Sequence, residues 1–537
     1  DLNGRQLVSG KNIDFSKCVF NDSVVLSDCD IDGQLLATKS VFGNIKSRDT
    51  VLVIDGCDIS GEVNFTDAWI SGIDSSNGSF GSDVIFTETW FDDSVKFNQA
   101  SFSQQANFDH VTFDSTADFS DCEFTRLANF EGSEFHGGEH SLDDAKFEGS
   151  EFSEARFSEV DFQFATFSSS TFSNGLEFNN SQCSGEFEFK GAEISDVLEI
   201  KGSEFGGDVS IEISLTDDAD LTDTLFRENV NLTVTAPERR IIIDMSNSLI
   251  SGGKISHKGD IPPLYDFTKA TIGKVIFLGG TDIFDYCKFR NTVFDNFNFT
   301  HHNLILSDNN YNLHNWKGYE MSDSEYDESE LTPEEIESTY LKAKNAAADS
   351  GDRKAAAEFF IKEMTFRRKK YTKIIKGNTR SLQDSNSLIE EDLSDKVSEF
   401  TKGGDLRTRL GAVGKWVGNW VLYQTCGYGE RLWRVIYISG IVVVVFGILF
   451  ATVTKGTSGV SNLATDGIDS VGTLLTPEGL VTVLKNIYFS MITFTTLGYG
   501  DIRPVGRTAG TLAGLESFIG ALLLALVVFV LGRRVSW

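Results

Sequence analysis

Phenylalanine recurs at fixed intervals in the first half of the chain, and this spacing restricts the possible folds more than any other feature of the sequence. Two interleaved series have a period of eleven and a third has a period of five: Phe86, Phe97, Phe108, Phe119 and Phe130; Phe91, Phe102, Phe113, Phe124 and Phe135; Phe147, Phe152, Phe157, Phe162, Phe167 and Phe172. A small residue stands two positions before each of them, as Ala106 precedes Phe108. Steps of five or six fit neither a helix, at about 3.6 residues per turn, nor a strand, at about 2. The spacing therefore predicts a chain that turns a corner at every step and stacks coil upon coil.

This pattern resembles the pentapeptide-repeat family, whose fold is a right-handed quadrilateral β-helix. The resemblance implies that each phenylalanine and its small neighbour point inward, while Asp, Asn, Ser and Glu face water. The match is clearest over Phe80–Phe178 and resumes over Phe284–Phe299. Between about Lys201 and Lys274 the rule is not followed, and we expect ordinary strands there, such as Arg240–Ile243. We assign residues 1–315 to this solenoid.

A helical hairpin is predicted after the repeats, over residues 316–376. Thr332–Glu335 has the residues of a helix start, with a capping threonine, a proline at the first helical position and a glutamate that completes a capping box. Ser350–Asp352 is expected to separate the two helices. The basic run Arg367–Lys370 either contacts anionic lipid headgroups or complements the negative end of its helix. Residues 377–408 are polar and are expected to be a linker.

Two segments near the end of the chain are long and apolar enough to cross a membrane. Val435–Val453 carries no charge over nineteen residues, and at about 1.5 Å per residue it spans about 28 Å. Thr511–Leu531 is the second segment. Basic residues flank the start of the first span and the end of the second, which predicts a multi-pass protein of the cell membrane with both termini in the cytoplasm. The apolar face of Leu410–Val421, with its tryptophans, is expected to lie at the membrane interface.

The segment between the spans has the most specific chemistry. A short helix is expected from Pro477 to about Thr495, and its negative end would favour a cation. Thr496-Leu497-Gly498-Tyr499-Gly500-Asp501 follows. To replace the hydration shell of a potassium ion, successive backbone carbonyls must face one axis. The backbone angles that this requires are readily available only to glycine, which explains Gly498 and Gly500.

This arrangement resembles the two-helix potassium channel family over Leu410–Trp537. The resemblance implies an ion-selectivity filter formed by Thr496, Leu497, Gly498, Tyr499, Gly500 and Asp501. K⁺ ions would bind to the backbone carbonyls of Thr496, Leu497, Gly498 and Tyr499. Tyr488 and Phe489 would support the filter, and Gly520 would be the gating hinge. It also implies a homotetramer in the lipid bilayer. Leu497 departs from the usual valine or isoleucine, but only its carbonyl should line the axis, so selectivity is expected to survive.

Glu516 is a carboxyl inside the second span, which is costly unless it is paired, hydrated or protonated. Its position places it behind the filter, within reach of Ser490, Thr493 or Thr495, where it would support the filter. Two interpretations remain open at this point. The carboxyl is either a protonatable brace that couples movement of the inner helix to the filter, or a neutral group that only holds the helices together.

The multidomain chain is therefore predicted to be a potassium-selective channel subunit, with its pore domain in residues 409–537 and a cytoplasmic solenoid that regulates it or binds a protein partner. A nonselective cation channel and a membrane-anchored scaffold are the alternatives. Gly427–Gly429 also reads G-Y-G, but no threonine precedes it and it lies before the first span, so an interfacial turn is expected. No catalytic constellation is visible, so the chain is not expected to be an enzyme, and the permeant potassium ion, with no organic cofactor, is the expected ligand.

Composition limits the partners. The chain carries 79 acidic and 47 basic residues, a net charge of -32, which argues against nucleic acid because phosphates require a basic surface. Such acidity fits either the salt-rich cytoplasm of a halophilic microbe or ordinary solubilisation of a long surface. Acidic soluble members of the pentapeptide-repeat family can mimic DNA, but the tether to a membrane segment favours a regulatory or partner-binding role here. The seven cysteines form no C-x-x-C pair and are expected to be buried thiols.

Overall fold

The computed structural model describes residues 2–3, 7–8, 11–43, 52–137, 145–236, 239–280, 282–317, 331–376, 406–453, 477–500, 502–504 and 507–536. The chain divides into two units, Asp1–Phe359 and Phe360–Trp537, and each is described separately. Most of the predicted linker, residues 377–405, lies outside the described part of the chain, as does Asp501.

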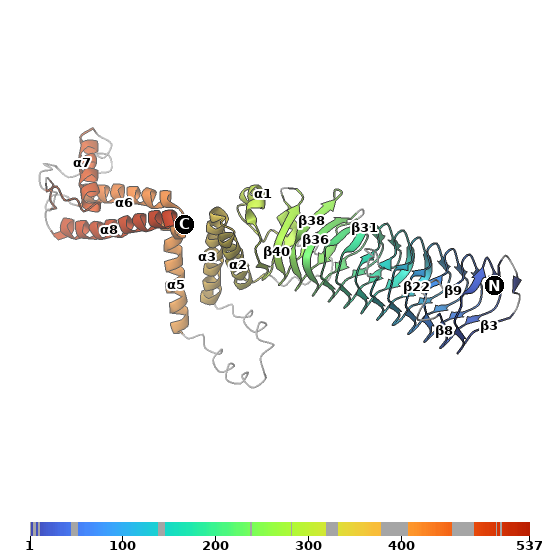
Figure 1. Ribbon diagram of the computed structural model, residues 1–537. Helices are drawn as coiled ribbons and strands as arrows, with labels where there is room; N and C mark the ends of the chain where they lie inside the picture. Colours follow the sequence, from blue (N-terminus) through green and yellow to red (C-terminus); the bar gives the residue numbers. More distant parts are fainter. Residues whose placement is uncertain are drawn as a thin grey trace. The chain divides into compact units, whose positions relative to one another are not determined.

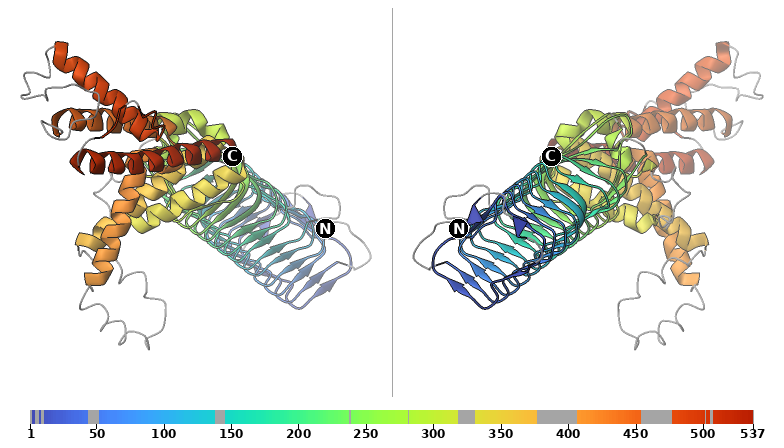
Figure 2. Two further views of the ribbon diagram at one scale, coloured as in Figure 1. Left: turned by 90° about the vertical axis from the view of Figure 1, so that its left-hand side faces the viewer. Right: turned by 90° about the vertical axis from the view of Figure 1, so that its right-hand side faces the viewer.

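The first unit is a parallel β-solenoid that runs from β1 (Leu2–Asn3) to β42 (Val293–Phe294) (Figure 1). Most strands are two residues long, and through the regular part each pairs with the strand four further along the chain. For example, β14 (Ser79–Phe80) pairs with β18 (Ser101–Phe102), and Phe80 lies opposite Phe102. Four short strands therefore make one coil, and Figure 2 shows the coils stacked one behind the next. The predicted fold class is confirmed.

The interior of the solenoid is a ladder of phenylalanine rings. Phe108 is fully buried and stacks on Phe86 at 5.3 Å and on Phe130 at 4.8 Å, with interplanar angles of 5° and 3°. Rings on neighbouring sides of a coil meet edge to face, as Phe108 and Phe119 do at 5.2 Å and 80°. Such pairs contribute about 0.5–1.5 kcal/mol beyond the burial of their area. The spacing in the sequence thus translates directly into the packing of the core.

A second ladder, made of hydroxyl and thiol groups, runs beside the rings. The small residues of several coils donate a hydrogen bond to the backbone carbonyl of a phenylalanine one coil earlier: Thr89 to Phe65, Cys122 to Phe97, Ser133 to Phe108, Ser150 to Phe119, Ser170 to Phe147 and Ser181 to Phe157. The same hydroxyls also accept from backbone, as Ser133 Oγ accepts from Val111 N at 3.0 Å. These groups stay buried at little cost because they join neighbouring coils.

The corners that separate the sides of a coil use left-handed backbone. Gln99 and Asp121 occupy equivalent positions in successive coils, with φ values of 63° and 55°, and His110, half a coil between them, has a φ of 54°. A non-glycine residue with positive φ is uncommon, so its recurrence every half coil shows that stacking of the coils imposes it.

Residues from about 201 to 274, where we expected ordinary strands outside the repeat, continue the solenoid. Its long strands, β34 (Val209–Leu215), β36 (Leu225–Thr235), β38 (Leu249–Lys258) and β40 (Thr271–Leu278), pair in parallel with one another and so continue the same ladder. The expected strand Arg240–Ile243 is instead β37 (Ile242–Asp244). Parallel pairing with the coils on either side allows these strands to lengthen without leaving the solenoid.

Short helices occur at the end of the solenoid. η1 (Ile283–Tyr286) precedes β41 (Cys287–Lys288) within the last coils, and after β42 the helix η2 (Phe299–His302) leads into α1 (Asn303–Asp308). The helix α2 (Pro333–Asp349) packs on this end of the solenoid. Its capping box is confirmed, with Thr332 and Glu335 bonded to each other's backbone N–H groups. Glu335 also pairs with Arg290, and Thr339 Oγ1 donates to Phe289 O at 3.1 Å. The residues of α2 therefore belong to the same unit as the solenoid, whereas the sequence suggested a separate hairpin from residue 316.

The helix α3 (Arg353–Lys376) begins after a turn at Gly351, whose φ is 77°. Its first residues belong to the first unit, where Phe359 meets Phe299 at 4.8 Å. The basic run Arg367–Lys370 lies inside the helix and not at its end, so the explanation by the helix dipole, which acts in the last turn, does not apply to it. Arg368 lies 4.8 Å from the ring centre of Tyr423.

The second unit is all helical. After α3 it contains α5 (Leu406–Cys426), η6 (Gly427–Gly429), α6 (Leu432–Val453), α7 (Pro477–Phe494) and α8 (Arg507–Ser536). Two of them, α6 and α8, are long and apolar enough to cross a membrane by length and composition. The G-Y-G sequence in η6 is a buried turn: Tyr428 has a φ of 58° and its hydroxyl hydrogen-bonds to Asn419 Oδ1 at 2.7 Å. Its expected place at the membrane interface stays a prediction.

The C-terminal end of the solenoid contains a buried histidine that makes its stability depend on pH. His302 stacks on Phe297 and meets Phe284 edge to face. This burial, together with the neighbouring His301, lowers the pKa of His302 to about 4, and a hydrogen bond that the imidazole donates to the backbone of Val275 opposes the shift. The unfolded chain binds a proton near pH 6.5 and the folded chain does not, so stability is lost as pH falls from about 6.5 toward 4. At pH 5 the loss is about 2 kcal/mol.

We therefore predict that His302→Phe weakens this acid sensitivity. The measurement is thermal unfolding of the detergent-solubilised protein at pH 7.5 and pH 5, followed by circular dichroism. His136→Gln, at an exposed position in a distant coil of the solenoid, is the matched control and should behave as wild type. Equal acid-induced shifts in the His302→Phe variant and wild type would contradict the assignment.

Candidate ion-conduction site

The candidate site is built on α7, which packs against both long apolar helices. Phe489 of α7 meets Phe450 of α6 at 5.0 Å and 70°, and Phe446, Ile492 and Ala513 complete this apolar cluster. The ring of Phe489 thus faces α6 of its own subunit, while Tyr488 is partly exposed. The filter-supporting role assigned to both aromatics stays a prediction.

Two glycines allow α7 to approach its neighbours closely. A Cβ atom on Gly520 of α8 would lie 2.1 Å from the carbonyl oxygen of Phe494, the last residue of α7. A Cβ atom on Gly447 of α6 would lie 2.7 Å from Cγ1 of Ile487. Gly520 was expected to be a hinge, which stays a prediction, but helix contact alone already requires glycine there. Gly447 was not identified from the sequence.

The backbone after α7 alternates in handedness. The chain leaves the helix through bonds from Thr496 N to Thr493 O at 3.1 Å and from Leu497 N to Ile492 O at 3.1 Å. Thr496, Gly498 and Gly500 then have φ values of 56°, 53° and 78°. Left-handed backbone at every second residue turns successive peptide planes in a way that allows their carbonyls to face one side, which ion coordination requires.

The side chains of Leu497 and Tyr499 in the segment after α7 are largely exposed within one subunit. Leu497 and Tyr499 are 59% and 68% exposed, and a Cβ atom on Gly498 would meet nothing within 4 Å. Within one subunit this segment is therefore largely uncovered. Among the residues that the structure describes, no group of three or more His, Cys, Asp or Glu side chains is placed to hold a metal ion.

One serine joins the three helices α6, α7 and α8. Ser490 Oγ of α7 lies 2.7 Å from the carbonyl oxygen of Val443 in α6 and hydrogen-bonds to Oε1 of Glu516 in α8. Nearby, Ser517 Oγ of α8 donates to Thr493 O at 3.1 Å, while Thr495 Oγ1 bonds within its own helix. Of the three partners considered for Glu516, the structure thus brings Ser490 into contact.

The proton count at Ser490 favours a neutral carboxyl. A serine hydroxyl carries one proton, and a carbonyl oxygen can only accept. If Ser490 donates to Val443, then Glu516 has to donate to Ser490 and must itself carry a proton. Glu516 is fully buried, and its Oε2 has no hydrogen-bond partner among the described residues. If Glu516 were ionised, the single proton of Ser490 could serve only one of its two contacts, to Val443 O or to Glu516. The buried negative charge would also lack a compensating partner among the described residues.

The chain matches two family models. The one described as "Ion channel" covers residues 465–536, and the one described as "Pentapeptide repeats (9 copies)" covers residues 97–139 and 119–166. No curated protein and no solved structure matches the chain. The matches support an ion channel subunit that also carries pentapeptide repeats, and the two membrane-capable helices indicate a membrane protein.

The neutral-carboxyl arrangement predicts how substitutions at Glu516 behave. In Glu516→Gln the amide can donate to Ser490 as the protonated carboxyl does, so thermal stability should stay close to wild type. Glu516→Ala removes the donor and leaves a cavity, at a cost of about 1–3 kcal/mol. Thermal unfolding in detergent measures both, with Ser439→Ala, which loses only a bond to Val435 O in its own helix, as control. Equal destabilisation by Gln and Ala would mean that the carboxylate form is the one required.

Proposed function

We propose that this chain is the subunit of a potassium-selective channel in which four copies surround one pore. The observation that carries the proposal is the left-handed backbone at Thr496, Gly498 and Gly500, placed directly after the C-terminal end of α7. The carbonyls of Thr496, Leu497, Gly498 and Tyr499 would bind the ions. One loop supplies only part of a coordination shell, and a ring of four supplies it from all sides.

Electrostatics support a cation as the permeant species. The C-terminal end of α7 carries partial negative charge, and this end is adjacent to Thr496. Leu497 contributes its carbonyl, while its side chain projects away from the loop and is exposed in one subunit. A nonselective pore would not need alternate left-handed positions, and a scaffold with a vestigial pore would need neither these positions nor the packing that holds α7.

The orientation of the subunit follows from its basic residues. Arg431 and Arg434 stand at the start of α6, and Arg533 and Arg534 lie near the end of α8. Basic residues favour the cytoplasmic side, so both ends of the pore domain, and with them the solenoid, would lie in the cytoplasm. There the solenoid would regulate the pore or bind a protein partner, and its acidity makes nucleic acid an unsuitable one. A halophilic source would account for the net charge of -32.

The test is Gly498→Ala. The added methyl group meets no atom within 4 Å in the subunit, so the substitution acts through the backbone, where a left-handed L-residue costs about 1–2 kcal/mol. Potassium flux into proteoliposomes should fall to background. Gly510→Ala on α8, where glycine also faces open space but has ordinary φ, is the matched control and should conduct as wild type.

Native mass measurement of the same variants separates a defective filter from failed assembly, because wild type, Gly498→Ala and Gly510→Ala should all give four-chain complexes. Unchanged potassium flux in Gly498→Ala would refute the filter assignment. Monomers or dimers as the only species of the wild type would refute the tetramer.

A further inference from the structure

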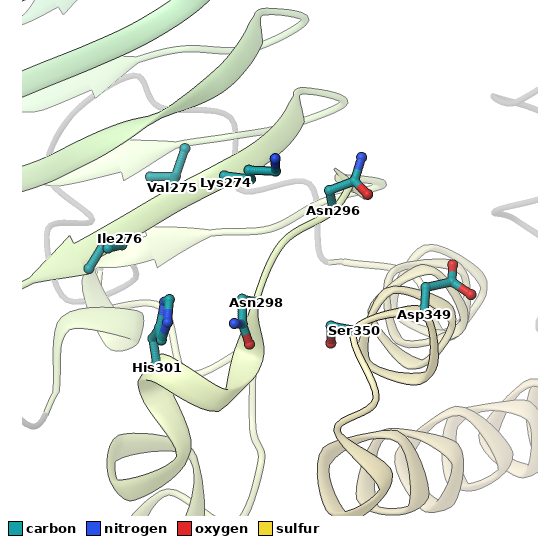
Figure 3. A pocket seen from close by; sticks show the side chains of 8 residues that line it. All are labelled: Lys274, Val275, Ile276, Asn296, Asn298, His301, Asp349 and Ser350. Carbon is teal, nitrogen blue, oxygen red and sulfur yellow. The ribbon is translucent and has the colours of Figure 1, made fainter.

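A cleft of about 480 Å³ lies at the end of the solenoid, inside the first unit (Figure 3). Three elements form it: β40 and the segment that leads through η2 on one side, and the C-terminal end of α2 on the other. The residues that line it are Lys274, Val275, Ile276, Asn296, Asn298, His301, Asp349 and Ser350. Its size falls within the usual range for small-molecule sites, about 300–1,000 Å³.

The solenoid side of the cleft is rich in hydrogen-bond donors. Lys274 is exposed on β40 and forms no ion pair among the described residues. The side-chain oxygen of Asn298 accepts a hydrogen bond from Thr300 N at 3.0 Å. This bond fixes the amide and leaves its NH₂ group as the donor. His301 adds an imidazole on the same side. Each of these groups can donate a hydrogen bond to a carboxylate, and Lys274 adds a positive charge.

The helical side of the cleft offers acceptors. Asp349, the last residue of α2, forms no ion pair within the described part of the chain, and its carboxylate stands on the element opposite Lys274 (Figure 3). Ser350 Oγ donates to Ala347 O at 3.1 Å, so its lone pairs remain to accept. The C-terminal end of α2 adds partial negative charge. This side suits an ammonium group.

The two sides together define the ligand. Val275 and Ile276 follow Lys274 on β40 and add apolar atoms to the solenoid side of the cleft (Figure 3), and the buried His302 is neutral above about pH 4. We propose that this cleft binds a small zwitterion, with Lys274 facing its carboxylate and Asp349 facing its ammonium group, the chemistry of a free amino acid. A plain anion would be repelled by Asp349 and by a chain of net charge -32, whereas a zwitterion has no net charge to repel.

Binding would connect two elements of the first unit. A zwitterion that spans the cleft ties β40 and η2 to the turn between α2 and α3. α3 begins at Arg353, three residues after Ser350. The site would therefore stabilise the position of this turn on the end of the solenoid. This claim concerns binding alone and does not depend on the proposed potassium selectivity.

The experiment is isothermal titration calorimetry on the full-length protein in detergent. The probes are glycine, β-alanine, γ-aminobutyrate and ε-aminocaproate, whose charges are separated by increasing chain lengths, together with acetate, methylammonium and inorganic phosphate. At least one zwitterion should bind at one site per chain, about tenfold or more tightly than acetate or methylammonium. Lys274→Ala and Asp349→Asn should each weaken it about tenfold or more.

Two matched controls accompany these variants. Lys254→Ala removes an exposed lysine from β38, and Asp308→Asn alters an exposed carboxylate at the end of α1; neither lines the cleft, and both should bind as wild type. Lys274 and Asp349 are themselves exposed, so their variants should fold, which circular dichroism checks. The proposal is overturned if no zwitterion binds, if binding is indifferent to both cleft variants, or if phosphate alone binds and Asp349→Asn strengthens it.

Discussion

The close packing of α7 between α6 and α8 fixes where the chain can place the segment Thr496–Gly500. Gly447 and Gly520 bring the three helices together, and the hydroxyl of Ser490 supplies a polar connection among otherwise apolar surfaces. Apolar contact between helices is not directional, and lipid tails offer a similar surface. The serine, the carboxyl of Glu516 and the carbonyl of Val443 therefore define one position for α7, and the segment Thr496–Gly500 begins from that position.

In the solenoid, too, buried polar groups with specific partners select one packing of an apolar core. Its phenylalanine rings would stack equally well at several registers, but the inward hydroxyls and thiols bond to particular carbonyls one coil away, as Ser133 does to Phe108. In both units, apolar side chains supply most of the burial, and a few buried polar groups with specific partners determine the register. The two parts of the chain thus use different folds but rely on similar means to select one packing.

Local patterns in the sequence predicted the elements well. The phenylalanine spacing gave the four-sided solenoid, the residues around Thr332 gave the capping box, and Pro477 marked the start of α7. These features depend on neighbours in the chain, so a single sequence carries them. The match of residues 465–536 to an ion channel model agrees with the predicted class of protein.

Features that depend on distant residues were not predictable in the same way. Nothing near Gly447 in the sequence indicates that Ile487 will press against it, and the small residues of the repeats do not show that their hydroxyls will bond to carbonyls more than twenty positions away. The cleft between β40 and the end of α2 combines residues about 75 positions apart. For Glu516, the sequence narrowed the partners to three, and only the packing of α7 on α8 selected Ser490.

We infer that potassium is selected by four copies of the Thr496–Gly500 backbone acting together. The reversal potential of the purified full-length protein in a planar bilayer tests this inference, with potassium on one side and an equal concentration of sodium on the other. Selectivity predicts a shift of about 59 mV for each tenfold ratio of permeabilities, and we expect a ratio of about ten or more. A conducting protein whose current reverses near zero under these conditions would contradict it.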